Sequence, residues 1–87
     1  MNTVKYKRNE TLLTNEVGEE IVMMSITESR YFGLNKTGKQ IWTLLEQPKS
    51  FDEICNALSK EYNISLHQCI NEVQPFFDEL IGERIIV

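Results

Sequence analysis

The stretch RYFGLNKTGKQIWTLL, residues 30–45, decides how this chain folds. Its first five residues, 30–34, have the aromatic and apolar composition of a β-strand. After Asn35, a residue type that caps helix N-termini, the apolar residues switch to helical spacing. The stretch holds no set of residues suited to acid–base, nucleophilic or metal chemistry. We therefore favour a function in binding over one in catalysis.

Two further strand candidates precede this stretch, at residues 11–14 and 21–27. The second is nearly all apolar at first, as expected of a central strand that is covered on both faces. Residues 15–20, which include Gly18, read as a turn, and Glu28 and Ser29 read as a tight turn. These short connections predict an antiparallel meander of three strands with residues 30–34 at one edge.

Two helices are expected between Asn35 and Asn63. The first begins after Asn35 and ends before Pro48. Ser50 opens the second, because Ser50 and Glu53 match the S-x-x-E capping box. Asn63 suits the left-handed residue that follows a helix end. Gly38, inside the first helix, suggests a close backbone approach, and the alternative is that the glycine is simply tolerated there.

A third helix is expected from Ser65, with Gln68 completing a second capping box, to Gly82. Its apolar residues span about 140° of the helix surface, wider than a simple core stripe needs. Pro75 should kink this helix without breaking it, and residues 84–87 form an extended tail that packs on the core. The order β-β-β-α-α-α predicts an α+β fold, a winged helix-turn-helix with a three-stranded antiparallel sheet followed by three helices.

Size and composition indicate one small domain over residues 1–87. The chain has 87 residues, 41% of them hydrophobic and 25% charged, which is ordinary for a globular protein. The formal net charge of −4 argues against non-specific nucleic-acid binding. We find no signal-peptide pattern and no apolar run of membrane-spanning length. With only two cysteines, the expected location is the cytoplasm.

No residue pattern supports a metal site, a cofactor or an enzyme. Cys55, His67 and Cys69 lack the paired spacing of zinc ligands, so we expect two core cysteines and one surface histidine. Glu72, Glu79 and Glu83 share one flank of the third helix. A solvated face is the default explanation for that flank, and an acidic rim beside a binding groove is the alternative.

A DNA-binding function is the main alternative that a winged helix suggests. The third helix would then be the recognition helix, yet it carries Asp78 and the three glutamates and no Lys or Arg before Arg84. Gln68 and Asn71 have the chemistry for reading bases but lack basic neighbours. We therefore do not expect a nucleic-acid partner.

The unprotected strand edge at residues 30–34 favours a peptide partner instead. It contains no Pro or Lys to block pairing, and a wide apolar helix face lies beside it in the predicted fold. An incoming peptide strand would gain backbone hydrogen bonds at such an edge. Cys69, Phe76 and Leu80 would form the pocket wall. The alternative is that Phe76 and Cys69 complete the core or a dimer contact.

The sequence also resembles the PqqD-like family, whose members are called recognition elements for ribosomally synthesised and modified peptides (RiPPs). The residues that carry the resemblance lie in residues 31–45, in Ser50-Phe51-Asp52-Glu53-Ile54 and in Phe76-Phe77-Asp78-Glu79-Leu80, within an overall match over residues 21–87. The most specific part is the pattern Tyr31-x-x-Leu34-Asn35-x-x-Gly38-x-x-Ile41-Trp42-x-x-Leu45.

This resemblance implies a non-catalytic chaperone that binds the leader of a precursor peptide and presents it to a maturation enzyme. The N-terminal Val4-x-Tyr6 looks most like the lasso-peptide subgroup, in which the partner enzyme is a leader peptidase. The leader would add as a strand to residues 30–34 and lie against the third helix, and homodimerisation through the same edge is an alternative. The implied peptide-binding residues are Arg30, Tyr31, Phe32, Gly33, Leu34, Cys69, Val73, Phe76, Phe77 and Leu80.

Overall fold

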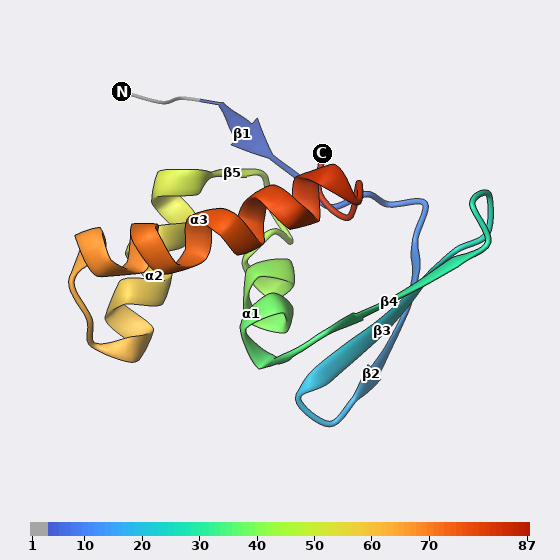
Figure 1. Ribbon diagram of the computed structural model, residues 1–87, viewed down its shortest axis with the longest axis horizontal. Coiled ribbons are helices and arrows are strands. Elements are labelled where there is room, and N and C mark those ends of the chain that lie inside the picture. Colours follow the sequence, from blue (N-terminus) through green and yellow to red (C-terminus); the bar gives the residue numbers. More distant parts are fainter. Residues whose placement is uncertain (1–3) are drawn as a thin grey trace.

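The computed structural model describes residues 4–87, so residues 1–3 of the predicted domain lie outside the described residues. A three-stranded sheet extends to one side of three helices, and a small two-stranded sheet ties the N-terminal segment to the helical part (Figure 1). The elements are β1 (Lys5–Tyr6), β2 (Leu13–Val17), β3 (Glu20–Ser25), β4 (Arg30–Leu34), α1 (Lys36–Leu44), β5 (Lys49–Ser50), α2 (Phe51–Tyr62) and α3 (Leu66–Gly82).

The larger sheet has the strand order β2-β3-β4, and both pairs of strands are antiparallel. The predicted meander is therefore confirmed, but the bounds of its first two strands were wrong. The first strand runs over residues 13–17 and not 11–14. All five of its residues are exposed, so no alternation of apolar and polar residues marks its bounds in the sequence. The turn after it is only Gly18 and Glu19, with Gly18 at a φ of 62°. The middle strand ends at Ser25, and a four-residue loop closes at Ser29, whose φ is 52°.

Caps define where α1 and α2 begin. The Asn35 side chain accepts from the Gly38 amide at 3.0 Å, as the sequence predicts for an N-cap. The capping box of α2 is complete: Glu53 N donates to Ser50 Oγ at 3.1 Å, and Ser50 N donates to Glu53 Oε1 at 2.9 Å. Asn63 ends α2 in the left-handed conformation.

The third helix has the predicted bounds, Leu66–Gly82 after the Ser65 cap, but its second capping box is incomplete. Ser65 Oγ accepts from the Gln68 amide at 3.0 Å, but the Gln68 side chain donates to Glu72 at 3.4 Å and does not complete a second capping box. The helix continues through Pro75, whose side chain is exposed, so the helix is not broken there. The helix ends at Gly82, as predicted, and the left-handed residue after its end is Arg84, with a φ of 58°.

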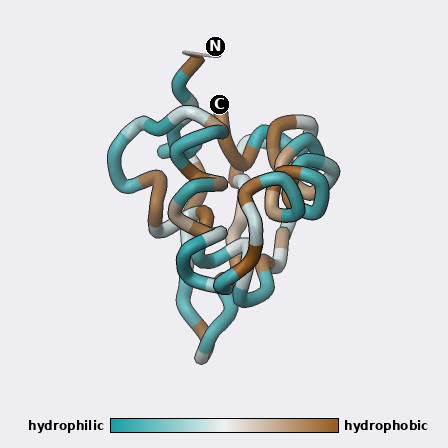
Figure 2. The backbone as a smooth tube through the Cα atoms, turned by 90° about the vertical axis from the view of Figure 1, so that its left-hand side faces the viewer, coloured by the Kyte–Doolittle hydropathy of each residue, from teal (hydrophilic) through white to brown (hydrophobic). Residues whose placement is uncertain are grey.

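The core lies where the three helices meet the inner face of the sheet. Hydrophobic and hydrophilic stretches alternate along the elements, as expected when each element buries one side (Figure 2). Phe77 is 1% exposed, and its ring lies 4.9 Å from the Phe51 ring and 5.0 Å from the Tyr6 ring. The other fully buried large side chains are Met23, Ile41, Leu45, Ile54 and Ile86.

The C-terminal tail packs beside the N-terminal segment, as predicted for residues 84–87. Lys7 and Val87 exchange two backbone hydrogen bonds of 2.8 Å each, and Ile85 and Ile86 are buried. These contacts tie residues that are about 80 positions apart in the sequence. Within residues 4–87, no helix has the length and apolarity needed to cross a bilayer.

Candidate functional site

The open edge of β4 is the structural starting point of the site. Among the described residues β4 pairs only with β3, so its second row of backbone groups has no strand partner. Leu34 is buried and Phe32 half-buried on the inner face, whereas Tyr31 and Gly33 lie on the outer face. With Tyr31 74% exposed, the outer side of this edge is open as well.

A groove separates β4 from the C-terminal half of α3. We name it the β4–α3 groove, and its cavity volume is about 320 Å³. Its floor and walls combine the strand edge with apolar and acidic side chains of the helix. The residues that line it are Arg30, Tyr31, Phe32, Gly33, Leu34, Phe76, Glu79, Leu80, Glu83 and Ile85.

A second cavity continues from this groove beyond Phe76. This α1–α3 pocket has a volume of about 420 Å³ and lies between the N-terminal ends of α1 and α3. Phe76 lines both cavities and is half-buried, so its ring forms the divide between them. The α1–α3 pocket is lined by Asn35, Thr37, Leu58, Tyr62, Ile64, Cys69, Glu72, Val73 and Phe76.

Gly38 allows the close packing that positions Phe76. A Cβ atom at Gly38 would lie 3.0 Å from Leu34 Cβ and 3.1 Å from Phe76 Cζ. Both distances are shorter than an ordinary carbon–carbon contact. The glycine therefore lets α1 approach β4 and α3 at the point where the two cavities meet.

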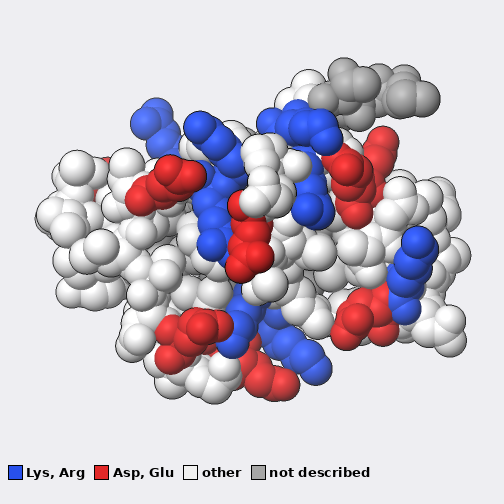
Figure 3. All heavy atoms as spheres, turned by 180° about the vertical axis from the view of Figure 1, so that it is seen from behind, with Lys and Arg blue, Asp and Glu red and all other residues white. Residues whose placement is uncertain are grey.

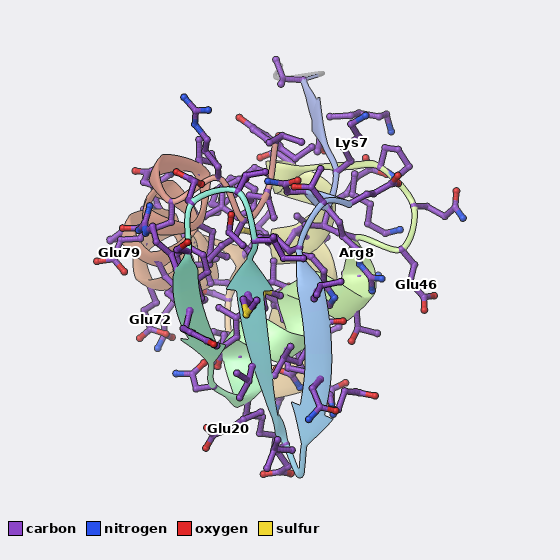
Figure 4. The ribbon with its side chains drawn as sticks, turned by 90° about the vertical axis from the view of Figure 1, so that its right-hand side faces the viewer. Lys7, Arg8, Glu20, Glu46, Glu72 and Glu79 are labelled. Carbon is purple, nitrogen blue, oxygen red and sulfur yellow. The ribbon has the colours of Figure 1, made fainter. Side chains whose placement is uncertain are left out.

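Acidic side chains border both cavities on the α3 side. Glu79 and Glu83 line the β4–α3 groove, and Glu72 lines the α1–α3 pocket. Glu72 and Glu79 project from α3 on the side of the molecule where β4 lies (Figure 4). The Arg30 guanidinium pairs with Glu83, which joins the strand edge to the end of the helix, and it also lies 4.9 Å from the Phe32 ring centroid.

Most of the residues that the resemblance implied lie around these two cavities. All five β4 residues, Phe76 and Leu80 line the groove, and Cys69 and Val73 line the pocket. Phe77 lines neither cavity. Its ring packs between Phe51 and Tyr6 in the core, so we remove Phe77 from the candidate site.

Several lining residues are outside the implied peptide-binding set, although the sequence left Glu72, Glu79 and Glu83 open as an acidic rim beside a groove. Glu79 and Glu83 come three and seven residues after Phe76, so helical spacing puts all three on one face of α3. This spacing is the sequence signal that could have identified the two glutamates as groove residues. Glu72 lies one turn before Phe76 and satisfies the same rule. Ile85 lines the groove through the fold of the C-terminal tail, for which the sequence has no local signal.

The two thiols are poorly suited to nucleophilic chemistry. Cys55 and Cys69 are free and buried. Burial, with the neighbouring Cys69 as a smaller cause, raises the pKa of the Cys55 thiol to about 12. Burial also raises the pKa of the Cys69 thiol. The structure of residues 4–87 contains no group of three or more His, Cys, Asp or Glu side chains placed to hold a metal ion.

A third cavity, about 450 Å³ in volume, lies between α1 and α2 and has no open strand edge. Its lysines already have partners, since Lys39 pairs with Glu16 at 2.8 Å and Lys36 with Glu19 at 3.9 Å. On the back of the molecule, basic and acidic side chains lie next to one another, so neither positive nor negative charge dominates that face (Figure 3). Helix α3 itself carries no Lys or Arg. These features do not favour a nucleic-acid interface.

Two comparisons with known proteins find a match to this chain. A family model described as coenzyme PQQ synthesis protein D (PqqD) matches residues 20–86, which include β4 and all three helices. The solved structure of TbiB1 in complex with the TbiA(beta) leader peptide is similar to this chain, with 26% sequence identity and a TM-score of 0.80. The similarity covers 92% of this chain and 93% of TbiB1. A search of curated proteins finds no match.

Proposed function

Since this chain belongs to the PqqD family, we propose that it binds the leader segment of a ribosomally synthesised precursor peptide. The observation that supports this most directly is the open edge of β4, which faces α3 across a groove lined by apolar and acidic side chains. The similarity to TbiB1, whose structure holds a leader peptide, extends over nearly the whole chain and supports the same conclusion.

The leader binds by strand addition at β4. Its backbone pairs with the free N–H and C=O groups of the strand, and these bonds supply affinity with little dependence on sequence. Alternate side chains of the added strand point toward α3, where Phe76 and Leu80 offer an apolar surface. Selectivity for one leader then depends on how its side chains fit the β4–α3 groove and the α1–α3 pocket.

The chain acts as a single, non-catalytic peptide-binding domain and presents the leader to a separate maturation enzyme. A leader peptidase of lasso-peptide biosynthesis is the partner that the sequence resemblance favours. A cytoplasmic location fits two buried thiols that are not joined in a disulfide. Strand addition leaves the outer face of β4, including exposed Tyr31, accessible to such an enzyme.

A titration with leader peptides tests this proposal. The probes are the leader of a precursor encoded beside this chain and, as a second probe, the TbiA(beta) leader. Phe76→Glu should weaken binding at least tenfold, because it places a carboxylate where the leader's apolar side chains pack. Its melting temperature should change little, since Phe76 is only half-buried.

Ile81→Glu is the matched control. Ile81 is also an apolar α3 residue with 36% exposure, but it lines neither cavity. This variant should bind the leader as the wild type does. Binding of duplex DNA without binding of either leader would contradict the proposal and favour the winged-helix DNA-binding alternative. A dimer that dissociates only on disruption of the β4 edge would favour the structural alternative.

A further inference from the structure

We infer that the peptide accepted by this protein is cationic around its apolar anchor, with Lys or Arg on both sides of the residue that contacts Phe76. This inference rests on the proposed function, and it adds the chemical class of leader that the groove selects. The observation that carries it is the charge of the two cavities, which is acidic along α3 and lacks a free cation among the described residues.

The acidic side chains form one stripe with Phe76. Glu72, Phe76, Glu79 and Glu83 are spaced by four, three and four residues, so they lie along a single face of α3. Every member of this stripe lines the groove or the pocket. Glu72 precedes Phe76 by about one turn and lines the pocket, and Glu79 follows it by about one turn and lines the groove.

The charges in the two cavities do not balance. Three carboxylates line them, and the only Lys or Arg among the lining residues is Arg30. Arg30 pairs with Glu83 and lies 3.8 Å from Glu28, so it does not neutralise the other two glutamates. Glu72 accepts only a 3.4 Å hydrogen bond from Gln68, and no Lys or Arg among the described residues pairs with Glu79.

The spacing of these carboxylates suits a strand that lies along α3. Seven residues of helix place Glu72 and Glu79 about 10 Å apart along the axis. In an added strand, the groove-facing residues on either side of one anchor residue are about 13 Å apart. The difference of about 3 Å lies within the reach of a flexible Lys or Arg side chain. An apolar residue against Phe76 then has a cation two positions before it and another two positions after it.

Peptide display tests this inference with probes that do not depend on the leader's own sequence. A library of random twelve-residue peptides is selected against the immobilised full chain at about 0.15 M salt, and the bound peptides are sequenced. The wild type should enrich apolar, strand-forming peptides with Lys or Arg at the two flanking positions. Each exposed ion pair should change affinity about two- to fivefold, so two pairs should change it about tenfold.

Three variants make the selection specific. The double variant Glu72→Lys/Glu79→Lys should enrich Asp or Glu at the same flanking positions, and Glu72→Gln/Glu79→Gln should remove the charge preference. The control Glu10→Lys/Glu46→Lys changes the net charge by the same amount as Glu72→Lys/Glu79→Lys. Its two substitutions are at exposed residues that line neither cavity. This control should keep the wild-type preference. Circular dichroism and the melting temperature establish that each variant is folded.

The possible outcomes separate this inference from the proposed function. Two outcomes overturn the inference alone. In the first, the wild type enriches apolar peptides without a charge preference. In the second, Glu72→Lys/Glu79→Lys shows the same charge preference as the wild type. A preference that is lost equally in the Glu10→Lys/Glu46→Lys control reflects net charge and also overturns it. If no peptide is enriched by any folded variant, the proposed function fails together with the inference.

Discussion

The substitution Gly38→Ala probes the packing that shapes the site. The added methyl group would lie 3.0 Å from Leu34 Cβ and 3.1 Å from Phe76 Cζ. The Phe76 ring can move away by rotating its side chain, but Leu34 Cβ moves only with the backbone of β4. Relief of the clash therefore requires a shift of the strand edge or of α1.

Two opposing effects set the size of the change in stability. Replacing Gly by Ala inside a helix stabilises it by about 1 kcal/mol. Overpacking of a close contact destabilises by about 1–3 kcal/mol, with the larger values where backbone must move. We expect the packing effect to exceed the helix effect, so that Gly38→Ala lowers the free energy of unfolding by about 1 kcal/mol. For a domain of this size, that corresponds to a drop of about 4–8 °C in melting temperature.

Urea and thermal unfolding measure this change, and Gly82→Ala is the control. Gly82 is also a helical glycine, but a Cβ atom there would have no heavy atom within 4 Å, so Gly82→Ala should be neutral or stabilising. Gly38→Ala should also weaken leader binding, because it displaces Phe76 and the β4 edge. A Gly38→Ala protein as stable as Gly82→Ala, with unchanged leader affinity, would refute the argument.

Three further predictions concern the fold. Glu53→Gln should lower the melting temperature at pH 7, and thermal unfolding at a series of pH values should show this difference vanish between about pH 4.5 and pH 2. The reason is that hydrogen bonds from the Ser50 amide, and then from Lys5, lower the pKa of Glu53 from 4.5 to about 2, so the stabilising charge is lost over that range. Phe77→Ala should cost about 3–5 kcal/mol in urea unfolding because Phe77 is fully buried, and a loss below 1 kcal/mol would place it outside the core. Asn63→Ala should destabilise by about 1 kcal/mol in the same assay while Asn63→Gly should not, since φ is 53° there; equal effects would contradict a left-handed cap.

Local sequence signals predicted much of this fold. The Asn35 and Ser50 caps, the left-handed Asn63 and the strand that runs into α1 depend on residues close together in the sequence. The boundaries of β2 were wrong because that strand is exposed throughout and shows no alternation of burial. The pairing of β1 with β5 was missed, since two-residue strands have no period to detect.

The site shows the same division between local and distant contacts. Phe76 and Phe77 are adjacent on a wide apolar face, and helical spacing alone does not decide which of them faces the groove. The choice depends on Phe51 and Tyr6, which come from α2 and β1 and pack against Phe77. Glu79 follows from helical spacing once Phe76 is placed, whereas Ile85 depends on how the C-terminal tail returns to the core.

Amide hydrogen exchange of β4, followed by NMR with and without bound leader, tests strand addition most directly. In the free protein, the amides of alternate β4 residues have no strand partner and should exchange rapidly. On saturation with leader, those amides should become strongly protected, while the amides that already pair with β3 change little. Leader binding that leaves the exchange of residues 30–34 unaltered would contradict strand addition at β4.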